Sequence, residues 1–297
     1  MRKTKKMIEI DGKTKICGLI GCPVEHTLSP LIHNTVANKQ GDNLVYVPFH
    51  VERDRVEDAI KGAYALNIKG LNVTVPHKSA VIPYLKELDP LAEKIGAVNT
   101  LVRVDGGYKG YNTDMTGLKR AMEKENIAIA DRDVILLGAG GASRAIAFLL
   151  VFQKAKSVYI LNRSLDKAQA LADEVNRTMQ TDVVKAARLD EYPSLPDKKY
   201  LCIQSTSVGL YPDCDSAVIE DALFYEKLDA AVDIIYKPAE TKFMKLCKNV
   251  GVKVCNGLGM LLYQGIDAYE LWNGVHIDDG LCDEIYKLMK EKTKVEE

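Results

Sequence analysis

The sequence lacks a dominant charge and long apolar runs, and each absence excludes a class of function. Forty basic and 41 acidic residues leave a formal charge of -1 over 297 residues, so no overall field favours nucleic acid or an anionic membrane. No apolar run is long enough to span a bilayer. The opening MRKTKKMIEIDGKTK is basic without a long apolar stretch after it, so we expect no cleaved signal peptide.

The seven cysteines also lack a pattern. They include no CxxC pair and no His/Cys cluster at metal spacing, which predicts reduced thiols in a cytoplasmic protein and no metal site. Buried packing is the role expected for most of them, and a single active cysteine is the alternative. Repeats and low-complexity segments are missing as well, so the remaining class is an ordinary globular protein with room for two cores.

Strand-like and helix-like segments alternate from Lys15 onward, which predicts an α/β protein with mostly parallel sheets. In the first half the expected strands are 16–20, 45–49 and 71–75, with a hairpin of 101–104 and 108–111. One helix is expected to begin with Ser29 as cap and Pro30 at its first position, and others to cover 56–66 and 113–125.

A second alternating series follows. Its expected strands are 133–137, 157–161, 182–186, 200–203, 230–235 and 252–255, and its expected helices are 143–152, 166–175 and 241–249. Two amphipathic helices at 260–272 and 281–290 have no further strand, so we expect them to pack on the first domain. This divides the chain into a substrate-binding and catalytic domain, 1–113 with 258–297, and a Rossmann-type dinucleotide-binding domain, 114–257, with a cleft between them.

A glycine-rich loop opens this second domain. The segment DVILLGAGGASRAIAFLLVF joins an apolar strand to a helix whose first backbone N–H groups would face a ligand in the loop, as in a pyrophosphate site. The loop residues are Gly138, Ala139, Gly140, Gly141, Ala142 and Ser143. Because a serine stands at the third fingerprint position in place of glycine or alanine, an ordinary strand-to-helix turn is the alternative.

The end of the next strand indicates which dinucleotide binds. An NAD site usually has an acidic residue there, whereas this strand ends in Asn162, Arg163 and Ser164, with Lys167 following. A guanidinium can bind a 2'-phosphate with two hydrogen bonds and stack on adenine, so NADP(H) is favoured over NAD(H). The alternative is that these are solvated charges and Asp166 caps the following helix.

Polar residues collect near the ends of the first domain's strands, where α/β sheets bind ligands. Thr27 and Ser29 place two hydroxyls at a helix start, which suits a carboxylate, although simple capping is the alternative. Lys78 and Asp114 could form an acid/base pair for carbonyl reduction. Amides and hydroxyls match the OH groups of a small polyhydroxylated acid, and Asn72, Thr74 and Asn99 supply them.

The chain resembles the shikimate dehydrogenase family over nearly its whole length. The segments that carry the resemblance are GCPVEHTLSPLIHN, NVTVPHK, GAVNTL, YNTD, GAGGASRA, NRS, IIYKPAET and NGLGMLLYQ. The resemblance implies a two-domain enzyme that reduces 3-dehydroshikimate reversibly to shikimate with NADPH, in aromatic amino acid biosynthesis.

The resemblance also implies roles for individual residues. Lys78 matches the family's catalytic lysine and Asp114 its partner, while Thr27 and Ser29 match hydroxyls that bind the carboxylate. Groups that bind ring hydroxyls correspond to Asn72, Thr74, Asn99, Asp114 and Gln264, a substrate-side tyrosine to Tyr236, and positions near the nicotinamide to Gly257 and Met260.

Departures from the family pattern leave alternatives open. Thr27 stands where serine is more frequent, and Met115 replaces a small glycine, so that it either narrows the cleft or fills core. One alternative is a dual quinate/shikimate dehydrogenase using NAD or NADP. Another is a non-catalytic ligand sensor with the same fold, which retention of Lys78 and Asp114 disfavours. A homodimer is left open, and His77 is expected to be a solvated turn residue.

Overall fold

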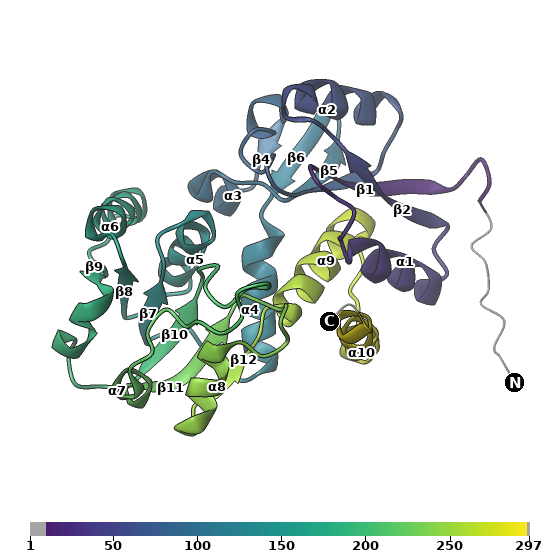
Figure 1. Ribbon diagram of the computed structural model, residues 1–297. Coiled ribbons are helices and arrows are strands. Elements are labelled where there is room, and N and C mark those ends of the chain that lie inside the picture. Colours follow the sequence, from purple (N-terminus) through teal and green to yellow (C-terminus); the bar gives the residue numbers. More distant parts are fainter. Residues whose placement is uncertain (1–9, 296–297) are drawn as a thin grey trace, which may run out of the picture. The chain divides into compact units, whose positions relative to one another are not determined.

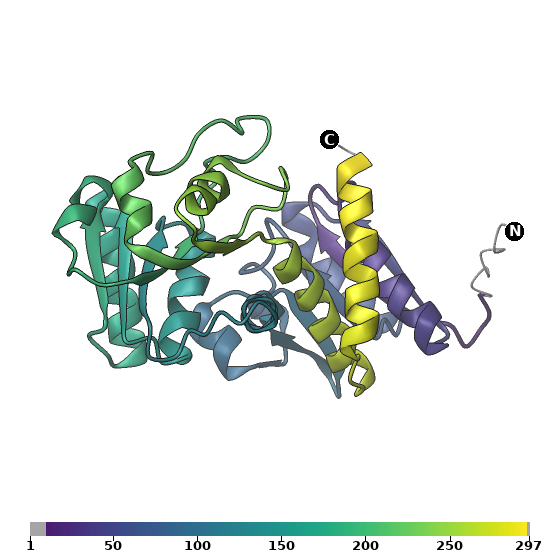
Figure 2. The ribbon, with the colours of Figure 1, turned by 90° about the horizontal axis from the view of Figure 1, so that it is seen from below.

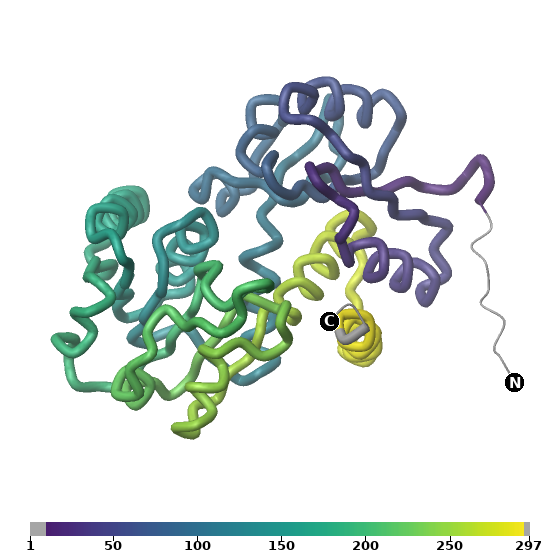
Figure 3. Tube along the Cα trace, in the orientation of Figure 1, coloured from purple at the N-terminus to yellow at the C-terminus, as the bar shows by residue number. Residues whose placement is uncertain are grey.

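The computed structural model describes residues 10–295 (Figure 1). The chain forms two compact units. The first takes the described residues up to Thr116 together with Leu262–Met289, and the second takes Gly117–Leu261 and the described residues from Lys290 onward. The tube in Figure 3 traces the chain out of the first unit and back into it. Lys78 and Asp114 therefore belong to the same unit.

The sheet of the first unit is mixed. Its strand order is β2-β1-β3-β5-β6-β4. The strands β1 (Lys15–Gly21), β2 (Leu44–His50) and β3 (Gly70–Val73) are parallel. Next to them, β5 (Thr100–Val104) and β6 (Gly107–Tyr111) form the predicted antiparallel hairpin, and the short β4 (Glu87–Leu88) pairs with β6. The parallel part brings the carboxyl ends of β1, β2 and β3 to one edge.

Helices lie on both faces of this sheet. Figure 1 shows α2 (Val56–Ala65) on one face and α1 (Ser29–Gln40) with α9 (Leu258–Asn273) on the other. From α9, Trp272 donates through Nε1 to the Leu101 carbonyl of β5 at 2.9 Å. Figure 2 shows α10 (Asp279–Val295) running beside α1, where Lys39 Nζ donates to Glu284 at 2.6 Å. The short α3 (Pro90–Ile95) begins at an Asp89 cap.

The second unit holds a six-stranded parallel sheet in the order β12-β11-β10-β7-β8-β9. Counted from β7, this is the 3-2-1-4-5-6 order of dinucleotide-binding folds. Its strands are β7 (Asp133–Leu137), β8 (Ser157–Asn162), β9 (Val184–Arg188), β10 (Tyr200–Gln204), β11 (Leu228–Asp233) and β12 (Lys253–Cys255). The crossover helices include α5 (Gly141–Phe152), α6 (Leu165–Met179), α7 (Ala222–Glu226) and α8 (Lys242–Asn249). The predicted Rossmann-type half is therefore confirmed.

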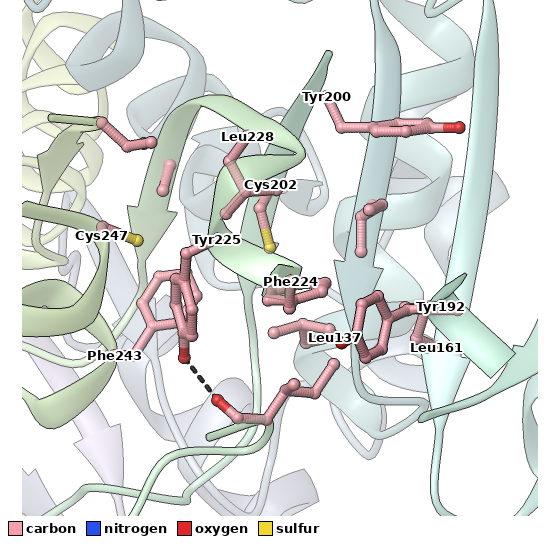
Figure 4. Packing of buried hydrophobic residues seen from close by; sticks show 14 of the residues in the cluster. Leu137, Leu161, Tyr192, Tyr200, Cys202, Phe224, Tyr225, Leu228, Phe243 and Cys247 are labelled. Atoms are coloured by element: carbon pink, nitrogen blue, oxygen red, sulfur yellow. Dashed lines mark hydrogen bonds between the residues drawn. The ribbon is translucent and has the colours of Figure 1, made fainter. Parts of the chain in front are cut away.

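Each unit has a core of its own. In the second, a cluster rich in aromatic rings packs against one face of the sheet, and Figure 4 labels Tyr192, Tyr200, Phe224, Tyr225 and Phe243 within it. The buried phenol of Tyr225 donates to the Ile219 carbonyl at 2.5 Å, so its polar atom is satisfied. The first unit packs aliphatic side chains of β1, β3 and α2 around Tyr108.

Several predicted boundaries were wrong. The strand β3 ends at Val73, not at Val75, because a turn closes there when the His77 N–H donates to the Thr74 carbonyl at 2.9 Å. The helix α5 begins at Gly141, two residues before the predicted start at Ser143, since Gly140 is its N-cap. Short elements without a periodic pattern were not predicted: α3, α7, β4 and the 3-10 turns Arg53–Arg55, Ile82–Tyr84 and Leu189–Ser194.

Candidate active site

Lys78 and Asp114 form an ion pair in the first unit. Lys78 lies in the turn after β3, and Asp114 is the second residue of α4 (Thr113–Lys124). Lys78 Nζ donates to Asp114 Oδ2 at 2.7 Å, with side chains 34% and 17% exposed. An ammonium held by a carboxylate and still open to solvent can give a proton to a bound carbonyl oxygen and take one back.

Asn99 holds the start of the helix that carries Asp114. Its Oδ1 accepts from the Thr113 backbone N–H at 2.6 Å and from the Thr113 hydroxyl at 3.2 Å. The Thr113 hydroxyl also lies 2.8 Å from that of Thr100. A helix N-terminus leaves backbone N–H groups unpaired, and here Asn99, the residue before β5, supplies the acceptor. The hydrogen bonds of the Asn99 side chain use its oxygen, which leaves its Nδ2 hydrogens for another partner.

Asn72 lies in a buried polar network and is only 3% exposed. Its Oδ1 accepts from Tyr46 at 2.7 Å and from His33 Nε2 at 3.1 Å. Its Nδ2 donates to Thr100 Oγ1 at 3.0 Å and to the Asn99 carbonyl at 3.3 Å. These four bonds use the full capacity of the amide. In this structure Asn72 therefore ties strand β3 to β5 and to His33.

His33 is a buried residue of this network that the sequence interpretation missed. Its ring stacks on Tyr46 with centroids 4.1 Å apart and lies 5.0 Å from Trp272. Burial lowers the pKa of His33 to about 3, so the ring is neutral at neutral pH. The sequence held one signal of this burial. His33 shares a helix face with the apolar Ile32 and Val36, which are both fully buried, because residues three and four apart lie on the same face.

Thr27 and Ser29 bring two hydroxyls together at the start of α1. Thr27 Oγ1 donates to Ser29 Oγ at 3.1 Å and accepts from the Ser29 backbone N–H at 3.2 Å. Ser29 was predicted as the cap, and this is wrong: the helix starts at Ser29, and no side chain of the preceding Leu28 caps it. The Thr27 hydroxyl accepts from the Ser29 N–H instead, and Ser29 is the first residue of the helix.

His77, predicted to be solvated, is instead 1% exposed. Its Nε2 donates to the Val51 carbonyl at 2.7 Å, so the ring ties the turn before Lys78 to the segment after β2. Next to the same turn, a Cβ at Gly21 would come within 2.3 Å of the Thr74 methyl group. The His77 hydrogen bond holds the backbone that presents Lys78, and the close packing beside Gly21 leaves no room there for a side chain.

In the second unit, the glycine loop has the geometry of a ligand cradle. Gly138 has φ +109°, and a Cβ there would meet Thr206 at 2.8 Å and Ser143 at 2.9 Å. A Cβ at Gly140 or Gly141 would meet no heavy atom within 4 Å. The loop therefore needs glycine at Gly138 for its own conformation, while the other two leave open space in front of the α5 N-terminus.

The hydrogen bonds of Ser143 account for a serine at the third fingerprint position. It is 1% exposed, and its Oγ accepts from the Gly140 N–H at 3.1 Å and lies 2.8 Å from Ser205 Oγ. Ser205 in turn donates to the Leu137 carbonyl at 2.7 Å. Through Ser205, the Ser143 hydroxyl therefore links the loop to the ends of β7 and β10.

Arg163 and Lys167 are exposed after β8, and neither forms an ion pair with any described residue. The Asn162 amide donates to the Ser164 carbonyl at 2.9 Å, which shapes the turn that leads into α6. The Ser164 hydroxyl makes no capping bond. Two cations and a hydroxyl thus stand unpaired at the strand end where a 2'-phosphate is expected.

The remaining predicted site residues are divided between the units. Gln264 lies in α9, in the first unit, and is 7% exposed, while the half-buried Tyr236 and Met260 lie in the second. Gly257 has a structural reason for its identity, since a Cβ there would come within 2.0 Å of the Ile234 carbonyl oxygen.

Comparison with known proteins identifies the family. Three family models match: the shikimate dehydrogenase substrate binding domain over residues 19–101, shikimate / quinate 5-dehydrogenase over 120–211, and the shikimate 5'-dehydrogenase C-terminal domain over 257–281. A curated relative from Caldanaerobacter subterraneus subsp. tengcongensis, named shikimate dehydrogenase (NADP(+)), is 42% identical over 91% of this chain and 96% of its own. The chain belongs to the shikimate dehydrogenase family.

Solved structures of shikimate dehydrogenases have the same fold. The enzyme from Listeria monocytogenes, in complex with shikimate and NAD, superposes with a TM-score of 0.87 at 31% identity, covering 96% of this chain and 100% of that one. The enzyme from Thermus thermophilus, in complex with NADP(H) and shikimate, has a TM-score of 0.80 at 32% identity, covering 92% and 98%. The predicted two-domain α/β fold of this family is thus confirmed.

One departure from the family pattern is explained by packing. Met115 is 2% exposed, and its N–H donates to the Asn112 side chain at 3.3 Å. It fills core space under the first turn of α4. The structure also has no helix, among the residues it describes, that is long and apolar enough to cross a membrane.

Proposed function

We propose that this chain catalyses the reversible reduction of 3-dehydroshikimate to shikimate with NADPH, in the pathway to aromatic amino acids. The observation that carries the proposal is the Lys78–Asp114 pair at 2.7 Å in a member of the shikimate dehydrogenase family. A binding module would have no need of a partly exposed ammonium held in contact with a carboxylate. This is the main ground for preferring an enzyme to a ligand sensor.

In the proposed reaction, Lys78 acts as general acid. When bound, NADPH supplies a hydride to the carbonyl carbon of the substrate. Lys78 gives a proton from Nζ to the carbonyl oxygen, which becomes the new hydroxyl, and Asp114 holds the ammonium in place. In the oxidation direction Lys78 takes the hydroxyl proton back. Asn99 contributes indirectly, because it fixes the helix start from which Asp114 extends.

The substrate is proposed to be held at both ends of its ring. Thr27 and Ser29 offer adjacent hydroxyls for the carboxylate. Ring hydroxyls are assigned to Asn72, Thr74, Asn99, Asp114 and Gln264, and Tyr236 is assigned to the substrate side of the site, as the family resemblance implies. Of these, Asn99 has amide hydrogens outside its described bonds, whereas Asn72 uses its amide within the protein and would act by positioning its neighbours.

NADP(H) is the proposed cofactor. The open space at Gly140 and Gly141 would accept the pyrophosphate against the N-terminus of α5, with Ala139 and Ala142 beside it. Arg163, Ser164 and Lys167 would bind the 2'-phosphate, and Gly257 and Met260 would lie near the nicotinamide. The unpaired state of the two cations supports this assignment.

Initial rates with shikimate and quinate, each paired with NADP and NAD, test the proposal. We expect shikimate with NADP to give the highest kcat/KM. Comparable rates with quinate would support the dual quinate/shikimate dehydrogenase instead. Absence of NADPH oxidation with 3-dehydroshikimate would overturn the proposal in favour of the ligand sensor.

We further propose that the enzyme works in a reducing cytoplasm. None of the seven cysteines, all of them in the described part of the chain, forms a disulfide, as expected where disulfides do not persist. A homodimer is the proposed alternative to a monomer, and analytical ultracentrifugation of the purified protein distinguishes the two.

A further inference from the structure

Three side chains that can bind metal ions meet at one edge of the first unit's sheet: Cys22, His50 and Glu52. Cys22 directly follows β1, and His50 is the last residue of β2. The two strands are parallel, with Gly21 paired to His50, so their carboxyl ends deliver these residues to one place. None of the three has a part in the proposed reduction.

The three side chains are spaced like the ligands of a metal ion. Cys22 Sγ lies 3.3 Å from His50 Nε2 and 3.8 Å from Glu52 Oε2, and Nε2 lies 3.0 Å from Glu52 Oε1. In a tetrahedral zinc site with bonds of about 2.0–2.3 Å, neighbouring ligand atoms are roughly 3.3–3.6 Å apart. Small side-chain rotations are therefore enough to bring all three onto one ion.

Glu25 adds an outer carboxylate to this group. Its Oε1 lies 3.7 Å from the second ring nitrogen of His50, Nδ1. Its Oε2 accepts from the Val24 backbone N–H at 3.0 Å, which holds the carboxylate in place. Histidines that bind metals usually direct their free N–H toward such a group, which fixes the ring and leaves the other nitrogen for the ion.

A thiol beside an imidazole is also found in nucleophilic cysteines, and the local charge decides between the two roles. Glu52 contacts the thiol and Glu25 lies beyond the ring, so negative charge opposes the thiolate that a nucleophile needs. Arg53 is a cationic neighbour that offsets part of this charge. A bound dication reverses the balance, because the same carboxylates then stabilise the ion together with the thiolate.

We propose that Cys22, His50 and Glu52 bind a divalent ion of the zinc class, with water as the fourth ligand and Glu25 orienting His50. The mixed sulfur, nitrogen and oxygen set suits zinc or cobalt and not magnesium or calcium, which take oxygen ligands. Binding converts the thiol to a metal-bound thiolate and releases one proton to solvent. His50 and Glu52 are 44% and 64% exposed, so the ion can exchange with solution.

The test is a titration of the reduced, metal-free full chain with Co²⁺, followed by displacement with Zn²⁺. We expect one equivalent of Co²⁺ to produce a thiolate-to-cobalt charge-transfer band, which Zn²⁺ then removes. Cys22→Ser should abolish the band, whereas Cys214→Ser, which changes a half-buried cysteine of the other unit, should retain it. His50→Gln, at an exposed position, should also abolish the band and checks the result independently of the Cys22 variant.

Zinc affinity measured by competition with a chelating dye gives a second readout. Glu25→Gln should weaken binding by about tenfold, as removal of an outer partner does, and Glu57→Gln, at an exposed residue of α2 paired with Lys61, should not. The proposal is overturned if wild type shows no band, or if the band or the zinc affinity survives Cys22→Ser. Because the readout is metal binding, the result is independent of dehydrogenase activity.

Discussion

At the scale of single residues, two kinds of side chain carry the proposed reaction. Lys78 is held by Asp114 across two separate elements and stays one-third exposed, so its amine can reach a ligand. Arg163 has no described ion-pair partner at the end of β8. Lys78 is positioned by protein contacts, whereas Arg163 is proposed to bind the 2'-phosphate of the cofactor. Substitutions at the two residues should therefore affect different kinetic constants.

Lys78→Ala is expected to lower kcat by about 10²–10⁴-fold, the usual contribution of a positioned general acid. Steady-state kinetics measures this, and thermal unfolding checks that the fold survives. Lys61→Ala is the matched control, because Lys61 makes a similar 2.6 Å contact with Glu57 away from the site and should retain full activity. If Lys78→Ala unfolds the protein, the result would show that Lys78 has a structural role and would contradict this prediction.

Arg163→Ala is expected to raise the KM for NADPH about 10- to 100-fold, because a hydrogen bond to a charged group contributes about 1.5–3 kcal/mol. The kcat at saturating NADPH and the KM for substrate should change little. Arg177→Ala, at an exposed arginine near the other end of α6, serves as control. An unchanged KM for NADPH would show that Arg163 is an ordinary surface charge.

At the scale of elements, the glycines in the turn from β7 to α5 differ in their conformation and in the atoms around them. Gly138 has a left-handed backbone and close neighbours, while Gly141 has neither. The Ser143 hydroxyl meanwhile satisfies the Gly140 N–H. Glycines in one fingerprint thus have different reasons for being glycine, which substitution by alanine can tell apart.

Gly138→Ala should destabilise the second unit by about 1–3 kcal/mol, since alanine is strained at positive φ and its Cβ would clash. Gly141→Ala should change the free energy of unfolding by less than about 0.5 kcal/mol, but raise the KM for NADPH because its methyl group occupies the proposed pyrophosphate space. Urea unfolding and steady-state kinetics measure the two effects. Equal stability loss in both variants, with no change in KM, would contradict the assignment of this space to the cofactor.

At the scale of the whole molecule, each unit buries a group whose shifted pKa bears on stability between pH 4 and pH 7. In the first unit, burial lowers the pKa of His33 to about 3. In the second, burial raises the pKa of Asp233 to about 6, against hydrogen bonds from Thr241 at 2.6 Å and from the Ile235 N–H at 3.0 Å. The two groups therefore give the stability of their units opposite dependence on pH.

Below pH 6.5, His33 is protonated in the unfolded state but stays neutral in the folded state. Lowering the pH therefore reduces the free energy of unfolding, by about 2 kcal/mol at pH 5. Asp233 binds its proton more tightly in the folded state than in the unfolded state. Its contribution to the free energy of unfolding is therefore largest below pH 4 and is lost as the pH rises through 6. At pH 5 this contribution is about 1 kcal/mol greater than at pH 7.

Hydrogen exchange at pH 5 and 7, with peptides assigned to each unit and rates corrected for intrinsic exchange, measures both effects. We expect the first unit to lose protection relative to the second at pH 5. Asp233→Asn should remove the pH dependence contributed by the second unit. Parallel changes in the two units, or no effect of Asp233→Asn, would contradict this account.

The sequence by itself determined the features that depend on neighbours in the chain. Strand and helix periodicity, the glycine loop and the motif order predicted two α/β domains of the shikimate dehydrogenase family, and the fold and family are confirmed. The roles of the predicted site residues stay predictions. Local pattern was sufficient for the fold because side-chain period and turn chemistry are set within a few residues.

Only the tertiary structure decided which distant residues meet. His33 and Asn72 are 39 positions apart, and Cys22 lies 28 positions from His50, so no local spacing reveals either contact. The prediction of no metal site looked for ligands at short spacing, whereas the Cys22, His50 and Glu52 group assembles from the ends of parallel strands. Burial likewise decided the neutral state of His33 and the full use of Asn72, because desolvation depends on the packing of every element around a side chain.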